Sequence, residues 1–327
     1  MSHLILHIGT HKTGSTTIQD TFSANSKYLA KRGLIYPKLN YRHSGHHGLI
    51  AESVALPKTF HLESGETASL EHINERYSRG NQTVFLSSEE FSRAEGGKSV
   101  NFAQLCKLLN GFDRISVLCF VRPQWRFLQS IYLEISRPRS PPRPPKLVEE
   151  AIETGRCQGL HMDYMDLLKR LSAVFSPSDI TLVDFEAARQ KNGGLIAAAL
   201  AIAGVQVDIS DLKAVKNGHS NQSPHGVSQW AANLLAEPYS ATTPIIKAVQ
   251  KTLKPVIASC VLTRHEIAEM NSAFAASNQT LLEARAAFQP EFQLSDPPLP
   301  NDCMFREDVT IEHWLGIGRE LARQQFS

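Results

Sequence analysis

Residues 9–17, with the sequence GTHKTGSTT, hold the residue types that bind a phosphate group. An apolar segment at residues 4–9 precedes them, and a helix is predicted from about Thr16. A glycine-rich turn between a strand and a helix directs backbone N–H groups at an anion, and the helix dipole favours negative charge. Lys12 adds a point charge, so the segment predicts a phosphate site. Its hydroxyl donors are Ser15, Thr16 and Thr17.

The order of glycines and lysine separates this turn from the loop of nucleoside triphosphatases. That loop has the form G-x-x-x-x-G-K-[ST], with the lysine directly after the second glycine. Here Gly9 and Gly14 keep the spacing, but position 15 is serine and the lysine lies two residues before Gly14. We therefore interpret the turn as a relative of the phosphate-binding loop with a different ligand. The alternative is a plain turn with a solvated lysine.

A second phosphate site is predicted where the apolar strand at about 114–123 ends. Arg122 lies at that end, and Ser130 follows eight residues later, one to two turns into the next predicted helix. A guanidinium group matches phosphate geometry with parallel hydrogen bonds, and a helical hydroxyl adds a further contact. Taken alone, the pair is more typical of surface residues. Its interpretation as a phosphate site depends on the presence of the first site.

Together the two sites resemble those of sulfotransferases that use 3′-phosphoadenosine 5′-phosphosulfate (PAPS) as donor. The 3′-phosphate site of that family, an arginine at a strand end and a serine eight residues later, is matched by Arg122 and Ser130. The phrase HIGTHKTGSTTIQ is most similar to bacterial members that modify carbohydrates, and the resemblance covers most of the chain. The family's phosphosulfate loop, K-x-G-[ST]-[ST], is matched by Lys12, Thr13, Gly14, Ser15 and Thr16.

The resemblance implies transfer of a sulfuryl group from PAPS to a hydroxyl on a saccharide or glycan, without a metal. The adenosine product is 3′-phosphoadenosine 5′-phosphate (PAP), and Lys12 would stabilise its leaving oxygen. Cytosolic members follow the loop with a tryptophan that stacks on adenine, and Thr17 stands there instead, so the adenine contact is not indicated. The implied cofactor-binding residues are His11, Lys12, Thr13, Gly14, Ser15, Thr16, Thr17, Arg122 and Ser130. Two alternatives are an ATP-dependent small-molecule kinase and a non-catalytic nucleotide-binding protein.

The acceptor hydroxyl needs a base, and three side chains are candidates. Glu89 follows a buried strand, and its placement resembles that of the catalytic histidine or glutamate of several sulfotransferases. His46 and His47 are the second choice, because histidine is a good base near neutral pH. For these two and for His43, a structural role in shaping the acceptor site is equally consistent. Glu90 is expected to be a solvated or structural neighbour.

Other polar segments are weaker candidates. Asp184 ends the strand ITLVD like a magnesium-binding aspartate, and we interpret it as a cap for the segment that follows. Lys216 and Asn221 are candidates for a basic loop over the cofactor, although a solvated turn is favoured. Residues 136–146 hold five prolines and four basic residues, which predicts an exposed loop without helix. Disorder ranks first for this loop, then acceptor contact, then partner docking. No convincing metal site is found.

Composition limits the function classes. The 327 residues carry a net charge of +2, which is too small to indicate nucleic acid as a partner. No apolar run is long enough for a membrane span, and the N-terminus lacks the pattern of a signal peptide, so a cytoplasmic location is expected. The five cysteines are scattered, which favours free thiols. Nothing in the sequence indicates the oligomeric state.

Alternating elements predict an α/β fold: a parallel sheet like that of phosphate-loop proteins, helices on both faces and a mostly helical C-terminal part. We expect a single domain over residues 1–327, because no clear linker is visible. The predicted strands are 4–9, 34–36, 83–91, 114–123 and 180–186. The predicted helices are 16–31, 125–135, 147–155, 161–175, 193–203, 224–236, 243–253, 264–287 and 309–325.

Overall fold

The chain forms two compact units, which are described separately. The computed structural model describes residues 1–39, 43–95, 98–137, 140–215, 225–253 and 258–325. The first unit consists of Met1–Arg122, Gln158–Ser220 and Ser277–Ser295. The second consists of Pro123–Cys157, Asn221–Ala276 and Asp296–Ser327. A single domain over residues 1–327 stays a prediction.

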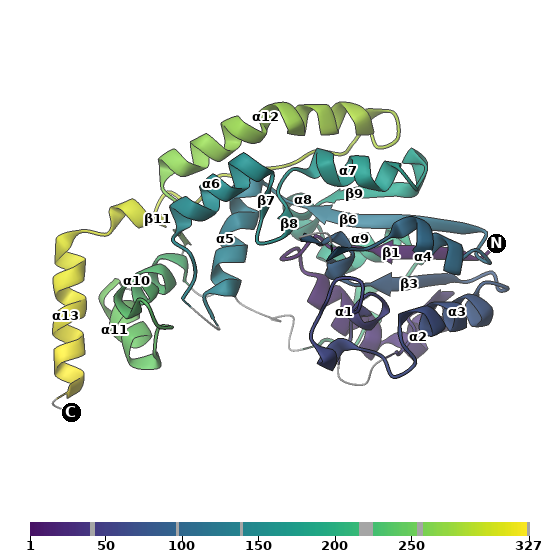
Figure 1. The fold of residues 1–327 in the computed structure, drawn as a ribbon, viewed down its shortest axis with the longest axis horizontal. Coiled ribbons are helices and arrows are strands. Elements are labelled where there is room, and N and C mark those ends of the chain that lie inside the picture. Colours follow the sequence, from purple (N-terminus) through teal and green to yellow (C-terminus); the bar gives the residue numbers. More distant parts are fainter. Residues whose placement is uncertain (40–42, 96–97, 138–139, 216–224, 254–257, 326–327) are drawn as a thin grey trace. The chain divides into compact units, whose positions relative to one another are not determined.

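A five-stranded parallel sheet forms the centre of the first unit, with the strand order β2-β3-β1-β6-β9 (Figure 1). Its strands are β1 His3–His7, β2 Leu34–Ile35, β3 Thr83–Ser87, β6 Arg114–Val121 and β9 Ile180–Asp184. The inner strands are apolar along most of their length because both faces of the sheet are covered. The predicted α/β class with a parallel sheet is therefore confirmed.

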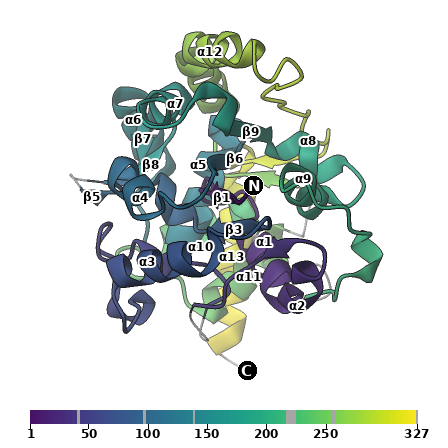
Figure 2. The same ribbon diagram turned by 90° about the vertical axis from the view of Figure 1, so that its right-hand side faces the viewer.

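Helices cover both faces of this sheet (Figure 2). One face carries α1 Ser15–Ala24, α2 Ser26–Ala30, α8 Phe185–Gln190 and α9 Gly194–Ile202. The other carries α3 Glu66–Tyr77, α4 Phe102–Leu108 and α7 Tyr164–Ser172. The core on the α1 side includes Phe22, Phe85 and Phe120, all fully buried. The short strands of this unit are β4 Ala94–Glu95, β5 Lys98–Ser99 and β8 Leu160–His161.

The second unit is mostly helical, as the sequence predicts for the C-terminal part. Its helices α10 and α11 pack together, and α11 also packs against α13, around Val227, Val249 and Ile317. The helices are α5 Gln124–Ile135, α6 Pro144–Thr154, α10 Gly226–Ala236, α11 Thr243–Leu253 and α13 Ile311–Gln325. Its short strands are β7 Arg156–Cys157, β10 Ser259–Cys260 and β11 Met304–Phe305. Helix α12, Arg264–Ala286, contributes residues to both units.

Several predicted boundaries are wrong, each for a local reason. The strand predicted over 83–91 ends at Ser87, because Ser88 caps a 3-10 helix at Glu89–Ser92. The strand predicted over 180–186 ends at Asp184, which caps α8. The proline-rich segment is not free of helix: α6 begins at Pro144, since proline is tolerated in the first helical turn. Arg139 of this segment lies outside the described residues.

None of the helices among the described residues is long and apolar enough to span a membrane.

Candidate functional site

The candidate site lies where four neighbouring parallel strands end. The register pairs His7 at the end of β1 with Ser87 of β3, and Val121 at the end of β6 with Asp184 of β9. Because parallel strands end at one edge of a sheet, the segments that follow them meet there, as is typical of ligand sites in α/β proteins. These segments carry the loop at 9–17, Glu89, Arg122 and the start of α8.

The loop depends on two glycines with positive φ. Gly9 has φ 92°, and a Cβ atom there would lie 2.9 Å from the Cβ atom of Glu89. Gly14 has φ 78°, and a Cβ atom there would lie 2.3 Å from a methyl group of Leu195. Both positions therefore disfavour a side chain by backbone conformation, and at Gly9 the contact with the Cβ and Cα atoms of Glu89 excludes one as well. Gly9 in particular allows Glu89 to lie directly against the loop.

The loop presents backbone donors at the start of α1. The N–H groups of residues 13–16 donate to no backbone carbonyl within the described part of the chain. The side chains of Thr13 and Ser15 are buried, and their hydroxyls lie 2.6 and 3.5 Å from the carbonyl oxygen of Thr10. Lys12 has φ 58°, so the chain turns sharply before the helix. Free N–H groups at a helix N-terminus beside a lysine fit an anion.

Arg122 connects the loop to α8. Its Nη1 atom donates to the carbonyl oxygen of Lys12 at 3.2 Å, and its Nη2 atom lies 2.5 Å from a carboxylate oxygen of Glu186. The Glu186 side chain is 1% exposed and also pairs with Arg189 at 3.2 Å. The Tyr164 hydroxyl donates to the carbonyl oxygen of Arg122 at 2.7 Å. These contacts fix Arg122 beside the loop, and Glu186 is a residue that the sequence analysis missed.

Glu89 lies beside the loop and is held by Gln19 of α1. The amide nitrogen of Gln19 donates to the Glu89 carboxylate at 2.9 Å. Burial opposes ionisation of Glu89, but the positive potential of His47 and His11 and hydrogen bonds hold its pKa below the usual value. Glu89 is therefore an ionised carboxylate at neutral pH. Gln19 is a second residue that the sequence analysis missed.

The two neighbouring histidines differ in their surroundings. His46 is buried: its Nε2 atom donates to the carbonyl oxygen of Pro37 at 2.7 Å, and its Nδ1 atom accepts from the N–H group of Ser87 at 2.9 Å. Both ring nitrogens are thus used to hold the chain. His47 has its Nδ1 atom 2.8 Å from the Ser88 hydroxyl. Its Nε2 atom lies near Gly45, where an added Cβ atom would come within 2.6 Å of it.

His11 and Glu90 form a polar cluster on the loop. The Nε2 atom of His11 lies 3.2 Å from one carboxylate oxygen of Glu90, and Nε of Arg93 lies 2.5 Å from the other. Burial opposes ionisation of Glu90, but these two partners lower its pKa to about 2. The Glu90 side chain is 15% exposed, so it is a structural partner of the loop rather than a solvated residue.

The remaining candidates lie elsewhere. Ser130 is half-buried on α5 of the second unit, so its pairing with Arg122 stays a prediction. Asp184 caps α8 by accepting from the N–H group of Ala187 at 3.1 Å, as the sequence predicts. Lys216 and Asn221 lie outside the described residues. Within the described ranges, no three histidine, cysteine, aspartate or glutamate residues are grouped so that they could hold a metal ion.

Two buried histidines beneath this edge make stability depend on pH. Burial lowers the pKa of both His7 and His46 to about 4, whereas an unfolded histidine has a pKa near 6.5. The unfolded chain therefore binds more protons below pH 6.5, and the free energy of unfolding falls as the pH drops from 6.5 to 4. We expect a loss of about 3 kcal/mol per histidine, measured by urea unfolding at several pH values. His46→Gln should flatten this dependence, and the matched exposed variant His72→Gln should not.

Comparison with models of known protein families gave no match, and a search of curated proteins gave none either.

Proposed function

We propose that this protein is a sulfotransferase that moves a sulfuryl group from PAPS to a hydroxyl of a saccharide or glycan. The observation that carries the proposal is the contact between Arg122 and the loop carbonyl of Lys12, at 3.2 Å. It supports the proposal because Arg122 lies beside the loop, and a donor with a 5′-phosphosulfate and a 3′-phosphate needs two anion-binding groups near each other. The lysine and the N–H groups of residues 13–16 would hold the 5′ end, and Arg122 with Ser130 the 3′-phosphate.

The residues have distinct roles in this reaction. The acceptor oxygen forms a bond to sulfur, the bond from sulfur to the 5′-phosphate oxygen breaks, and the hydroxyl proton passes to a base. Lys12 and the loop N–H groups would stabilise the charge that develops on the leaving oxygen. Glu89 is our first choice for the base, because it is an ionised carboxylate beside the loop. His47 is the second choice, and His46 is more consistent with a positioning role, since both its ring nitrogens are engaged.

The kinase alternative has less support. An ATP-dependent enzyme of this fold class uses an aspartate at a strand end to organise magnesium. Both carboxylate oxygens of Asp184 are occupied, one by the N–H group of Ala187 and the other by that of Ser295 at 2.8 Å. Asp184 is thus engaged in fixing the backbone.

The proposal is tested by calorimetric titration of the full chain with PAP, ATP and ADP. We expect PAP to bind tightest and without magnesium, and ³⁵S-labelled PAPS to transfer its label to a saccharide in a mixed panel. A preference for ATP with magnesium-dependent turnover would overturn the proposal in favour of a kinase. Tight PAP binding with no transfer to any saccharide, small alcohol or water would favour the non-catalytic alternative.

The assignment of the base gives a separate prediction. Glu89→Gln should lower the rate of transfer about 100-fold or more while PAP affinity is retained, because a positioned base contributes that much. His47→Gln should have a smaller effect. In the unaltered protein, the rate should not fall as the pH drops from 7.5 to 6, since the pKa of Glu89 is held below its usual value. A rate that falls between pH 7.5 and 6, together with a larger loss in His47→Gln, would assign the base to an imidazole instead.

A further inference from the structure

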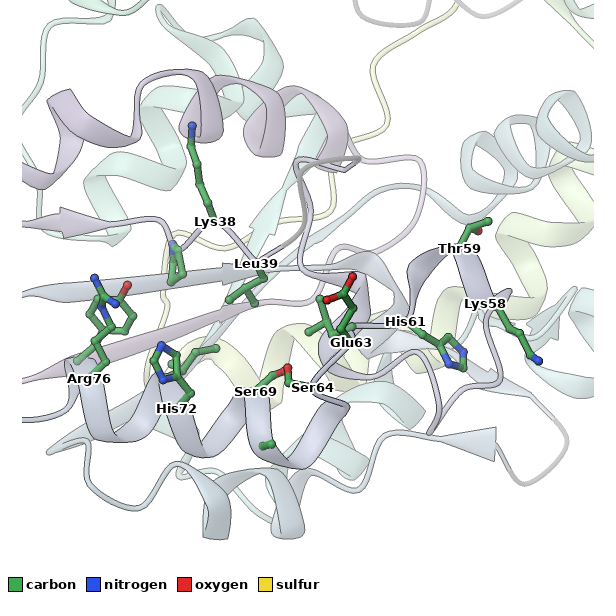
Figure 3. A pocket seen from close by; sticks show the side chains of 15 residues that line it. Lys38, Leu39, Lys58, Thr59, His61, Glu63, Ser64, Ser69, His72 and Arg76 are labelled. Carbon is green, nitrogen blue, oxygen red and sulfur yellow. The ribbon is translucent and has the colours of Figure 1, made fainter.

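A groove of about 970 Å³ lies beside α3 in the first unit (Figure 3). Its volume is at the upper end of the range for ligand sites, so it has room for more than one sugar ring. Helix α3 contributes Ser69, His72 and Arg76, which are spaced three and four residues apart and share one face. The segment after β2 contributes Lys38, and the segment before α3 contributes Lys58, His61, Glu63 and Ser64.

The groove carries an excess of positive charge without internal partners. Lys38, Lys58 and Arg76 are exposed, and Glu63 is the one carboxylate among the residues that line it. Among the described residues, none of these three cations takes part in an ion pair, although Arg76 lies over the ring of Tyr77 at 5.5 Å. Elsewhere in this unit, arginines such as Arg93 and Arg114 do pair with carboxylates. Unpaired cations around a groove attract an anionic ligand.

Two segments that line the groove are linked to the histidine pair, His46 and His47. Pro37 lines one wall, and its carbonyl oxygen accepts the hydrogen bond from His46 at 2.7 Å. On the other side, Phe60 lies between the lining residues Thr59 and His61, and its ring packs on His47 with centroids 5.4 Å apart. The groove therefore extends away from the histidine pair, along α3. The lining residues Pro37, Thr59 and His61 are thus in contact with the histidine pair or directly adjacent to a residue that is.

We propose that this groove binds the acceptor and that the acceptor is an acidic saccharide chain, with carboxylate or sulfate groups along it. Lys38, Lys58 and Arg76 would contact these groups, and the hydroxyls of Thr59 and Ser64 would contact the sugars. The inference rests on the proposed function for the identity of the bound chain as acceptor. The binding step depends only on the charge and size of the groove.

The experiment compares hexagalacturonate, which has a carboxylate on every ring, with the neutral maltohexaose. Titration calorimetry of the full chain should detect hexagalacturonate and not maltohexaose, and binding should weaken as salt increases. The double variant Lys38→Glu/Arg76→Glu should bind hexagalacturonate at least about 10-fold more weakly, because two attractive charges become repulsive. The double variant Lys27→Glu/Lys107→Glu makes the same charge change at exposed positions outside the groove and should bind normally.

Equal binding of both saccharides, or an equal loss in both double variants, would overturn the inference. With labelled PAPS, the groove variant should raise KM for hexagalacturonate and leave kcat and PAP affinity unchanged. Groove-dependent saccharide binding in a protein that neither binds PAP nor transfers label would overturn the proposed function and keep the groove as an acidic-saccharide site. PAP binding and transfer to a neutral saccharide alone would keep the function and reject the groove.

Discussion

Replacing Arg122 by alanine is expected to weaken PAP binding by roughly 100-fold or more, because charge-assisted hydrogen bonds from a guanidinium group to phosphate are lost. The affinity for the 3′-phosphate should fall most, so adenosine 5′-phosphate, which lacks that group, should bind the variant and the unaltered protein about equally. Calorimetric titration with both nucleotides measures the difference.

Arg122→Ala is also expected to lower the stability of the protein, and this effect must be distinguished from the loss of PAP binding. Glu186 is 1% exposed and pairs with Arg122 at 2.5 Å, so Arg122→Ala leaves a buried carboxylate with Arg189 as its remaining arginine partner. Removing one partner of a buried ion pair costs about 3–5 kcal/mol of stability when no other partner remains. The loss should be smaller here, because Arg189 remains. The double variant Arg122→Ala/Glu186→Gln removes the charge as well. It should recover thermal stability and should not recover PAP binding.

Arg114 provides a matched control on the same strand. It lies at the start of β6, opposite the end that carries Arg122, and it pairs with Asp179 at 2.7 Å while half-exposed. Arg114→Ala removes an arginine and an ion pair far from the strand ends. It should leave PAP affinity within about twofold, because exposed ion pairs contribute little. An unaltered affinity in a folded Arg122→Ala protein would remove the 3′-phosphate site from the proposal.

In the proposed site, Glu186 would also affect how Arg122 binds a phosphate. Its carboxylate neutralises part of the charge of Arg122, and a phosphate that binds the same guanidinium meets a nearby negative charge. The second contact from Arg189, at 3.2 Å, offsets this by leaving two arginines for one carboxylate. The carboxylate thus orients the guanidinium without cancelling the local positive charge. Its pairing with Arg122 could not be predicted, because nothing local links residues 64 positions apart.

The parts of the fold that were predictable are those with a local signal. β1, β3, β6 and β9 are short apolar runs bounded by polar residues, and the loop after β1 has its glycines at fixed spacing. Because the strands are parallel, their ends had to share one edge, so the loop, Glu89 and Arg122 could be expected together. The strand ends were less certain, since a single cap such as Ser88 or Asp184 stops a strand that its apolar residues would continue.

The missed features lack such a signal. Helix α3 has three buried residues, Ser69, Leu70 and Ile73, so its amphipathic pattern is weak. Two of them, Ser69 and Ile73, also line the groove, and most of the other residues of the helix are polar. Gln19 is an ordinary helix residue in sequence, and its contact with Glu89 spans 70 positions. Tertiary packing determines both the formation of α3 and the contact between Gln19 and Glu89, and it cannot be deduced from a single sequence.

Replacing Lys12 by methionine is expected to lower the rate of sulfuryl transfer about 100- to 1000-fold, the usual loss when one donor to a developing negative charge is removed. Methionine keeps the length and apolar stem of lysine. Lys12 has φ 58°, a conformation that is equally strained for methionine, so the backbone of the loop should be unaffected. PAP affinity should change far less than the rate, since the N–H groups of residues 13–16 and Arg122 remain.

The role of Lys12 is assigned by comparing the change in the transfer rate of Lys12→Met with the change in its PAP affinity. Lys107→Met removes the same charge from an exposed position on α4 and should change neither quantity. A Lys12→Met protein that binds PAP normally and still transfers at the usual rate would show that the lysine does not stabilise the leaving oxygen. The N–H groups of residues 13–16 would then have to supply that stabilisation alone. A loss of PAP affinity with kcat unchanged would instead assign Lys12 to ground-state binding, because only an interaction made in the transition state lowers kcat without weakening PAP.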